Sequence, residues 1–397
     1  MKKVLEGIRV LDCSRIVAGP YCSLLLASMG AEVIHIERPG GEIDWEIGPP
    51  LAEGEGRTSH PLYTNCNKKG ITLNLGTEKG RQLFSELVKR SDVVVQNYSY
   101  GGAKKFNLTY EQLEKINPKI IVAAISGFGQ TGPYHERNCW DPNAQAMSGM
   151  MSLGGFPGSP PTRTPLPVVD MSSGVYGALG IMYALRHRDM TGEGQLVDVA
   201  LFDVATYYTG IVAMEMDKAN QQRIQVGNAT YWAFANTFRA RDGWVFISLT
   251  TDGVWKRFCR LIEKEDLISD KRYRDDYHRF INRETLIPEV EEWTKSNTVS
   301  RLVEITEKNH IPCSPVNDIA TAMADPQVQA REMLVDIDYG GDLGQVPVPG
   351  VVVKMSKTPG MIDEPCPSPG QDNKEVYGKI LGMEDNELES LAVEGII

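Results

Sequence analysis

Several features that commonly reveal a protein's function are missing from this 397-residue sequence. Its seven cysteines are dispersed and include no Cys-x-x-Cys pair, so we expect reduced thiols and no metal site. Basic residues number 41 against 52 acidic ones, which disfavours nucleic acid or an anionic membrane as a partner. We expect no membrane span, because no apolar stretch approaches the ~20 residues that one requires. These absences predict a cytoplasmic protein.

The sequence also lacks two motifs that would direct the interpretation. Glu6 and Arg9 interrupt any apolar run at the start of the chain, so we do not expect a signal peptide. The turn after the first predicted strand, residues 13–20, lacks the Gly-x-Gly-x-x-Gly that lets a dinucleotide pyrophosphate approach a helix N-terminus. A nicotinamide or flavin cofactor is therefore disfavoured, and no tightly bound cofactor is expected.

Strand and helix patterns alternate through the first half of the chain. Buried-strand patterns occur at residues 7–12, 31–37, 92–96 and 119–125, and helical patterns lie between them. This alternation predicts the α/β class, with a Rossmann-like large domain built on a parallel sheet. Such a sheet binds its ligands at the carboxyl ends of the strands.

The pattern changes in the second half of the chain. A hairpin signal at Asp242 and Gly243, followed by helical patterns between about 255 and 308, indicates a smaller α+β domain. A chain of this length is expected to form more than one hydrophobic core. The predicted parts are a large domain of residues 1–195 and 325–397, a linker helix at 196–224 and a small domain at 225–324.

One carboxylate, Asp170, has a suggestive position in the middle of the chain. It follows a proline-rich segment at 157–167 and precedes an apolar pattern at 174–185 that predicts a largely buried helix. Aspartate is a preferred N-cap residue, so capping alone would explain its position. From the pattern alone, a cap and a chemical centre both remain possible.

Two loops, residues 65–69 and 97–105, combine paired lysines with amide or aromatic side chains. We expect both loops at the carboxyl ends of strands, where α/β proteins bind ligands. Lysine pairs are more commonly part of a solvated surface, and that interpretation also stays open.

Taken together, several short segments resemble the family III CoA-transferases, which include formyl-CoA:oxalate and carnitine-pathway enzymes and have 2-methylacyl-CoA racemases as relatives. No single segment is decisive, but they occur in the family's order across nearly the whole chain. The matching positions are Leu11, Asp12, residues 18–20, 30–34, 36–38, 67–69, 117–118 and 126–132, Asp170, and residues 191–194 and 311–316.

The resemblance implies an acyl-CoA:carboxylate CoA-transferase in which Asp170 is the nucleophile. Asp170 would attack the thioester of an acyl-CoA to give an aspartyl anhydride, and the CoA thiolate would return to form an aspartyl-CoA thioester. A carboxylate with an unperturbed pKa is ionised at neutral pH, so it needs no partner base. Acyl-CoA and a small carboxylic acid are then the substrates, and CoA is not a bound cofactor.

The resemblance also implies residues that contact the substrates. CoA carries a 3′-phosphate and a pyrophosphate, so basic side chains are expected around it. The candidate CoA-binding residues are Ile16, Val17, Ala18, Arg38, Lys68, Lys69, Asn97, Tyr98 and Lys105. The candidates for an acyl pocket, which as methionine and aromatic residues are also typical of a plain core, are Trp140, Met147 and Tyr231.

The chain departs from the family pattern at two places. Val17 replaces a glutamine of the formyl-CoA branch, and residues 227–230 replace its longer glycine run, which disfavours oxalate and favours a bulkier or more apolar acid. Trp140 replaces the histidine that racemases use as a second acid-base group, and indole cannot transfer a proton in this way.

Two alternatives to a transferase therefore remain. A 2-methylacyl-CoA racemase is disfavoured by Trp140, although His135 lies close to it in sequence. A non-catalytic acyl-CoA binding protein would need the basic groups but not Asp170. The resemblance further implies a homodimer of two interlocked chains, for which the sequence pattern itself offers no evidence.

Overall fold

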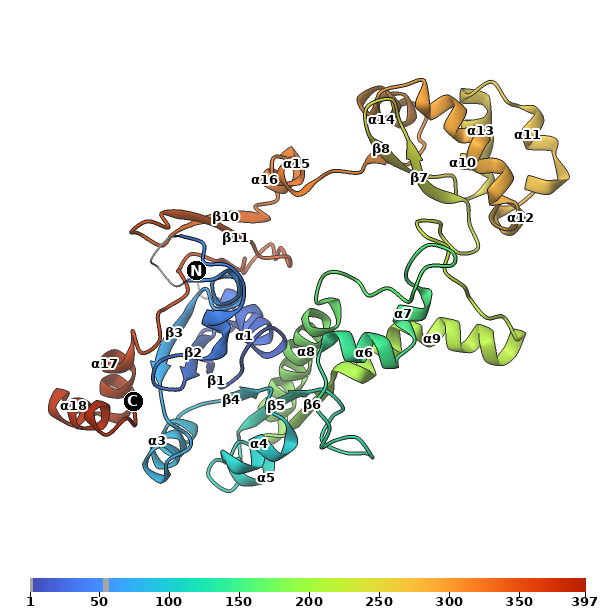
Figure 1. Ribbon diagram of the computed structural model, residues 1–397. Coiled ribbons are helices and arrows are strands. Elements are labelled where there is room, and N and C mark those ends of the chain that lie inside the picture. Colours follow the sequence, from blue (N-terminus) through green and yellow to red (C-terminus); the bar gives the residue numbers. More distant parts are fainter. Residues whose placement is uncertain (1–2, 53–56) are drawn as a thin grey trace. The chain divides into compact units, whose positions relative to one another are not determined.

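The computed structural model describes residues 3–52 and 57–397, and its largest sheet has six strands (Figure 1). All five pairings in this sheet are parallel, in the order β3-β2-β1-β4-β5-β6. This is the strand order of the Rossmann fold, and it confirms the predicted α/β class. The strands are β1 (Arg9–Asp12), β2 (Glu32–Glu37), β3 (Lys68–Thr72), β4 (Val93–Gln96), β5 (Ile121–Ser126) and β6 (Leu196–Ala200).

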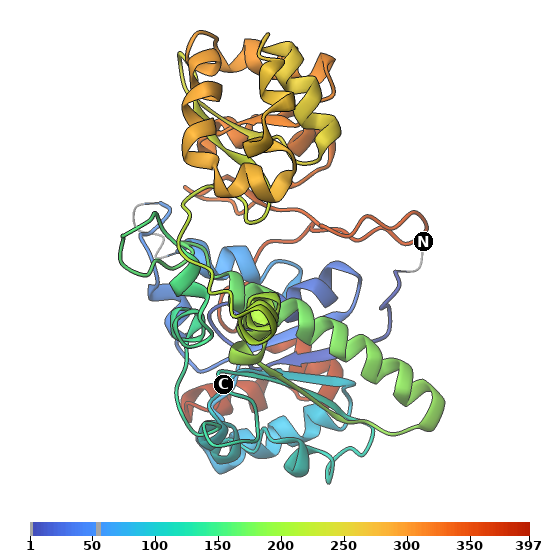
Figure 2. The ribbon, with the colours of Figure 1, turned by 90° about the vertical axis from the view of Figure 1, so that its right-hand side faces the viewer.

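Helices cover both faces of the sheet, as Figure 2 shows from the side. One face packs against α1 (Ala18–Ser28) and α8 (Val168–Thr191), and the other against α3 (Glu78–Val88) and the C-terminal α18 (Asp385–Val393). The central strands are therefore buried on both sides, which explains why they consist of uninterrupted apolar residues rather than alternating ones.

The remaining elements of this part of the chain are shorter, apart from one long helix, α9. They are η1 (Ile43–Glu46), α2 (Ser59–Thr64), α4 (Tyr100–Lys105), α5 (Tyr110–Leu113), α6 (Asp141–Met147), α9 (Leu201–Ala219), α16 (Pro326–Ala330), an antiparallel hairpin of β10 (Leu334–Asp338) and β11 (Gln345–Pro349), α17 (Asn373–Val376) and the π-helical turn η3 (Tyr377–Leu381). Of α7 (Met150–Leu153), only Met150 belongs to this part of the chain.

Glycines in α8 allow this helix to approach α1 closely. A Cβ atom on Gly174 would lie 2.7 Å from the carbonyl oxygen of Ala18, and one on Gly177 would lie 3.1 Å from the Cys22 sulfur. A Cβ would therefore force the two helices apart. Because α1 and α8 both begin at the carboxyl edge of the sheet, their close packing fixes the relative position of their first turns.

Helix α8 is also, by length and composition alone, apolar enough to cross a membrane, with a mean hydropathy of 1.3 over 18 residues. The expectation that no apolar stretch approaches this length was wrong, because the helix extends well beyond the apolar core at 174–185 in both directions. In the structure its inner face packs on the parallel sheet and on α1, as in the core helix of a soluble α/β domain.

A second compact unit has its own sheet and core. Its antiparallel sheet joins β7 (Ala235–Arg239), β8 (Trp244–Ser248) and β9 (Cys313–Pro315), and Asp242 and Gly243 form part of the turn between the first two strands. Its aromatic and aliphatic core is separate from those of the large sheet. The helices are α10 (Asp252–Leu261), α11 (Asp266–Ser269), η2 (Lys271–Tyr273), α12 (Asp276–Ile281), α13 (Arg283–Lys295), α14 (Val299–Lys308) and α15 (Ile319–Met323).

The boundaries between the two units follow the contacts of the chain. The first unit comprises Met1–Met150, Arg163–Ala219 and Pro326–Ile397, and the second comprises Met151–Thr162 and Asn220–Asp325. The segment predicted as a linker helix thus contributes β6 and α9 to the first unit. A short excursion of the chain, Met151–Thr162, belongs to the second unit although it precedes α8 in sequence.

Candidate active site

A cleft of about 240 Å³ lies at the carboxyl edge of the parallel sheet. Its walls come from the β1–α1 loop, from residues that follow β4 and β5, from residues 135–140 and from the first turn of α8. The strand order reverses between β1 and β4, and open α/β sheets bind their ligands at such a switch point. Asp170 lies in this cleft.

Asp170 does not cap α8, which removes the simplest alternative explanation of its position. The helix begins at Val168, so Asp170 is its third residue. The backbone N–H groups of Val169 and Asp170 donate instead to Oδ2 of Asp141, at 2.8 and 3.1 Å. No residue in the described ranges donates a hydrogen bond to the Asp170 carboxylate, which is therefore available to a ligand.

Asp141 is the residue that fixes the start of α8. It is itself the first residue of α6, and its side chain is buried. Its second oxygen, Oδ1, accepts a hydrogen bond of 2.5 Å from the Gln145 side chain, and the Gln145 side-chain oxygen accepts from the Thr164 N–H group at 3.0 Å. Both oxygens of Asp141 are thus occupied, and the cap is held in one orientation.

The surroundings of Asp170 raise its pKa to about 7. Burial is the larger cause, because it disfavours the charged form, and the negative charge of Asp141 is the second. The expectation of an unperturbed carboxylate was therefore wrong. At pH 7 roughly half of the Asp170 side chains are ionised, and the ionised form is more basic than an ordinary aspartate.

Six of the residues predicted to contact substrates line the cleft together with Asp170. They are Ile16, Val17, Ala18, Asn97, Tyr98 and Trp140. Asn97 fixes the loop after β1, since its side chain accepts from the Arg15 N–H at 3.0 Å and donates to the Arg15 carbonyl at 2.7 Å. The indole of Trp140 is largely exposed at the cleft.

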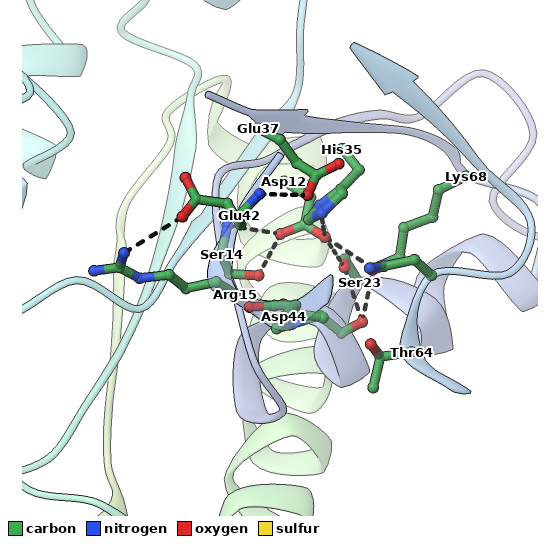
Figure 3. Close-up of polar contacts among 12 residues, drawn as sticks. Asp12, Ser14, Arg15, Ser23, His35, Glu37, Glu42, Asp44, Thr64 and Lys68 are labelled. Atoms are coloured by element: carbon green, nitrogen blue, oxygen red, sulfur yellow. Dashed lines mark hydrogen bonds and ion pairs between the residues drawn. The ribbon is translucent and has the colours of Figure 1, made fainter. Parts of the chain in front are cut away.

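Lys68 does not line this cleft, contrary to its assignment as a CoA-binding residue. Figure 3 shows its contacts with Asp12 and neighbouring groups inside the protein. Its side chain is fully buried, and its ammonium group donates to Oδ2 of Asp12, the carbonyl oxygen of Pro20 and the side chain of Asn65, at 2.9, 2.9 and 2.7 Å. All three N–H donors are therefore used inside the protein, and none is left for a phosphate.

Lys69 is also misplaced by the sequence argument. It pairs with Glu32 and Glu375, at 3.0 Å each, and it does not line the cleft. The reason is that Lys68 and Lys69 begin β3, a strand that the pattern did not predict. They therefore lie at the amino end of a parallel strand, opposite to the edge at which the cleft opens.

Four other predicted residues do not line the cleft either. Arg38 follows β2 at the correct edge of the sheet and donates to the Gly41 carbonyl at 2.8 Å, and Lys105 is exposed at the end of α4. Met147 is exposed at the end of α6. Tyr231 belongs to the second unit, where its ring contacts other aromatic rings. Their roles in binding substrates remain predictions.

The structure adds three cationic or ionisable side chains that sequence reasoning did not select for CoA. Arg15 lies 4.7 Å from the ring centre of Tyr98, Arg137 lies 3.9 Å from that of Tyr134, and both line the cleft. His135 lines it as well. The position of Arg15, three residues after a buried strand, could have suggested a role in binding. The lysine pairs of two other loops were selected for CoA instead.

No metal centre accompanies this cleft in the described ranges, which contain no group of three or more His, Cys, Asp or Glu side chains able to hold an ion. The groups that the cleft offers to a substrate are the Asp170 carboxylate, the guanidinium groups of Arg15 and Arg137, and the backbone. A carboxylate with a raised pKa, in a cleft that guanidinium groups also line, suits attack on an activated carbonyl within an anionic substrate.

The fold and the cleft thus define a Rossmann-like protein with an available carboxylate at its switch point. The model of CoA-transferase family III matches residues 5–373, and the chain belongs to this family. It is similar to the succinyl-CoA:mesaconate CoA-transferase of Haloarcula hispanica, with 36% identity over 92% of both chains. It is also similar to the succinyl-CoA–L-malate CoA-transferase beta subunit of Chloroflexus aurantiacus, with 36% identity over 99% of this chain and 98% of that one.

A solved structure shows the same fold. The crystal structure of a CAIB/BAIF family protein from Brucella suis superimposes with a TM-score of 0.85 at 33% identity, covering 96% of this chain and all of that one. Together with the named relatives, this likeness identifies the chain as a CoA-transferase that acts on CoA thioesters and acids. The family predicted from its scattered motifs is confirmed.

Proposed function

We propose that Asp170 is the nucleophile through which this enzyme moves CoA from an acyl-CoA to a free carboxylic acid. The observation that carries the proposal is the available Asp170 carboxylate in the cleft. Asp141 takes over the capping of α8, and no described residue donates a hydrogen bond to the oxygens of Asp170. A side chain with a raised pKa and no structural duty is suited to chemistry.

Each step of the proposed reaction exchanges one acyl bond for another. A carboxylate oxygen of Asp170 attacks the thioester carbonyl, the C–S bond breaks, and the CoA thiolate leaves with the bonding electrons. The thiolate then attacks the aspartyl carbonyl of the anhydride, which releases the donor acid and leaves CoA on Asp170. The acceptor carboxylate then attacks this thioester, which releases the CoA thiolate and forms a second anhydride between Asp170 and the acceptor. The thiolate attacks the acceptor's carbonyl in this anhydride and forms the product acyl-CoA. Asp170 is regenerated without ATP.

Backbone N–H groups at the start of α1 are proposed to stabilise the oxyanions of these steps. No described group accepts a hydrogen bond from the N–H groups of Ala18 and Gly19, which open α1, and Ala18 lines the cleft. At the start of α8, by contrast, Leu166 and Asp141 already accept the first N–H groups. Leading N–H groups of a helix favour developing negative charge.

We propose that donor and acceptor are both small dicarboxylic acids, with succinyl-CoA as the donor. The relatives are named for succinyl-CoA and for mesaconate or L-malate, all derivatives of four- or five-carbon dicarboxylic acids. Arg15 and Arg137 would provide one guanidinium for the free carboxylate of the acyl group and one for the phosphates of CoA. This favours a charged acid over the more apolar one expected from Val17.

Trapping the aspartyl intermediate tests the nucleophile. Enzyme incubated with succinyl-CoA and then with hydroxylamine should carry a hydroxamate on the peptide that contains Asp170, detected by mass spectrometry. Asp170→Asn should show no modification and no turnover. Asp189→Asn, an exposed aspartate at the other end of the same helix, is the matched control and should behave as wild type. Full turnover by Asp170→Asn would refute the proposal.

A panel of acceptor acids tests the substrate class. With succinyl-CoA as donor, four- and five-carbon dicarboxylates should give at least tenfold higher kcat/KM than monocarboxylates of equal length, because a monocarboxylate has no second carboxylate to pair with a guanidinium of the cleft. Arg15→Ala or Arg137→Ala should reduce this preference, whichever of the two binds the distal carboxylate. Equal rates for both classes of acid would contradict the assignment.

The alternatives of racemase and passive binder make different predictions. His135 lines the cleft, so a second acid-base group is available despite Trp140. A racemase would incorporate solvent deuterium at C2 of a chiral 2-methylacyl-CoA, whereas a transferase would not. A passive binder would retain CoA but give no hydroxamate at Asp170.

We further propose that the enzyme is a homodimer. Large apolar side chains are exposed along α8 and α9, which would be unusual for a monomer. They include Val175, Leu179, Met182, Tyr183, Tyr207, Ile211 and Met214. Sedimentation should give twice the mass of the chain, and Tyr183→Glu should weaken association. Val393→Glu, at an even more exposed apolar residue on α18, is the control, and loss of the dimer in that variant alone would refute the assignment.

A cytoplasmic location is proposed on the state of the cysteines. All seven are free, and five of them are buried thiols. Buried free thiols are typical of proteins from reducing compartments. Fractionation of the producing cells should find the enzyme with a cytoplasmic marker, and recovery with an exported marker would contradict the proposal.

A further inference from the structure

One residue of the cleft wall has an unusual backbone conformation. Ile16, in the loop between β1 and α1, has a φ angle of +72°. A β-branched residue in this left-handed region is a genuine outlier, because its side chain crowds the backbone there. Such conformations persist only where the surrounding structure holds them, and they concentrate at functional sites. Ile16 lines the same cleft as Asp170.

Hydrogen bonds from two other segments hold the loop at this point. The Ile16 N–H donates to Oδ2 of Asp44 at 2.6 Å. The preceding residue, Arg15, exchanges two hydrogen bonds with the side chain of Asn97. Asn97 follows β4, whereas Asp44 comes from η1, after β2, so the loop is clamped from both neighbouring strands.

The base of the loop is rigid as well. Ser14 donates its N–H, at 3.0 Å, and its hydroxyl to Oδ1 of Asp12, at the end of β1. The other oxygen of Asp12 accepts from Ser23 at 2.6 Å and from Lys68 at 2.9 Å (Figure 3). The buried ion pair therefore anchors the loop where it leaves the sheet, and Asp44 accepts its hydrogen bond from the loop two residues further on.

Within residues 3–52 and 57–397, the buried Asp44 carboxylate has only one of its two oxygens hydrogen-bonded, and the donor is the Ile16 N–H. Asp44 is 1% exposed, and its Oδ1 atom has no hydrogen-bond partner among the described residues. Burial raises the pKa of Asp44, and the charges of Glu37 and Glu42 raise it further, whereas the hydrogen bond from the Ile16 N–H and the nearby His35 lower it. A half-satisfied buried carboxylate is expensive, and a packed apolar residue would be cheaper at a position without a further task.

We propose that Asp44 is a positioning residue, which holds Ile16 in the left-handed conformation and thereby shapes the wall of the acyl-CoA cleft. The inference rests on the proposed function, since it assumes that the cleft binds CoA thioesters. Asp44 itself lines no part of the cleft. It acts through the backbone of Ile16. Its effect on CoA binding should therefore be large when residue 16 is strained in the left-handed conformation and small when residue 16 adopts it freely.

Equilibrium binding of CoA, measured by calorimetry, is the primary test because it does not depend on Asp170 being a nucleophile. Asp44→Ala should weaken CoA binding about tenfold, the effect of losing one hydrogen bond to a charged group. Asp44→Asn retains an oxygen that can accept from the Ile16 N–H, and it should bind CoA within about twofold of wild type. An equal loss in both variants would overturn the proposal.

A double-mutant cycle separates positioning from a general structural role. Glycine adopts the left-handed region without strain, so in an Ile16→Gly background the Asp44→Ala change should weaken CoA binding less than about threefold. Val17→Gly is the matched control, because Val17 has a φ angle of −128° and gains nothing from glycine. The full tenfold effect should persist in that background. Equal effects in the two backgrounds would refute positioning through Ile16.

The remaining outcomes are also informative. If Asp44→Ala does not fold, the Ile16→Gly and Asp44→Ala double variant should fold, and its failure to do so would show a general structural role instead. If wild-type enzyme does not bind CoA, the proposed function itself fails. If wild type binds CoA and Asp44→Ala binds it equally well, only the role of Asp44 is refuted.

Discussion

Replacing Asp141 by asparagine should shift the pH dependence of the enzyme to lower pH. The asparagine side-chain oxygen can still accept from the N–H groups of Val169 and Asp170, so the start of α8 should keep its cap. The negative charge next to Asp170 is lost. Since that charge is one of the two causes that raise the pKa of Asp170, the pKa should fall.

The size of the change follows from the order of the two causes. The pKa of Asp170 rises from 3.8 to about 7, and burial contributes more of this rise than Asp141 does. Removing the charge should therefore lower the pKa by less than half of the rise, or about one pH unit, which corresponds to about 1.4 kcal/mol. Burial is unchanged, so the pKa should settle near 6.

The assay is the rate of the first half-reaction as a function of pH, followed by release of CoA thiol from succinyl-CoA. In the proposed mechanism only ionised Asp170 attacks, so the wild-type rate should rise with pH and reach half of its plateau near pH 7. The Asp141→Asn midpoint should lie near pH 6, with a lower plateau because a less basic carboxylate is a weaker nucleophile. Asp203→Asn, which removes an exposed charge at the start of α9, is the control and should leave the midpoint unchanged. An unshifted midpoint in Asp141→Asn would refute the electrostatic coupling.

Two further predictions concern stability. A carboxylate whose folded-state pKa is raised keeps its proton longer in the folded protein, so stability is lost as pH rises from about 4 to about 7. Asp170→Asn avoids this loss, and urea unfolding should show it stabilised by about 2 to 3 kcal/mol more at pH 8 than at pH 5; the same difference at both pH values would contradict the raised pKa. Lys68→Met leaves the buried Asp12 charge without its ammonium partner and should cost about 3 to 5 kcal/mol at pH 7. Lys69→Met, in a half-exposed pair, should cost less than about 1 kcal/mol, and similar losses for the two lysines would argue against the buried pair.

The sequence was sufficient to predict the sheet where its strands are buried on both faces. In a chain where strand and helix patterns alternate, a short uninterrupted apolar run such as the one that ends before Gln96 predicts a buried parallel strand. β3 escaped prediction because it starts with Lys68, Lys69 and Gly70, whose side chains do not indicate a strand. Because of that omission we expected both lysines at the carboxyl edge of the sheet, where the family resemblance implied contact with CoA. Lys68 has no N–H donor left for such a contact.

The sequence was sufficient to single out Asp170, but not the residues that hold the cleft and the start of α8 in place. Asp170 was identified because it precedes a long apolar helix, and the family resemblance then suggested its role. Asp141 was not selected, although an aspartate followed by Pro142 is a recognisable helix start. Its contact with α8 spans 29 positions of sequence, and no local pattern reveals a hydrogen bond between such distant residues. The same applies to Asp44 and Ile16.

The cap that Asp141 provides has a consequence for how this enzyme can diversify. Between Asp141 and Asp170 the chain leaves the first unit and returns, and the excursion Met151–Thr162 belongs to the second. Two hydrogen bonds at 2.8 and 3.1 Å tie the ends of this detour together. Insertions, deletions and substitutions within the detour can therefore accumulate while Asp170, the proposed nucleophile, keeps its place in the cleft.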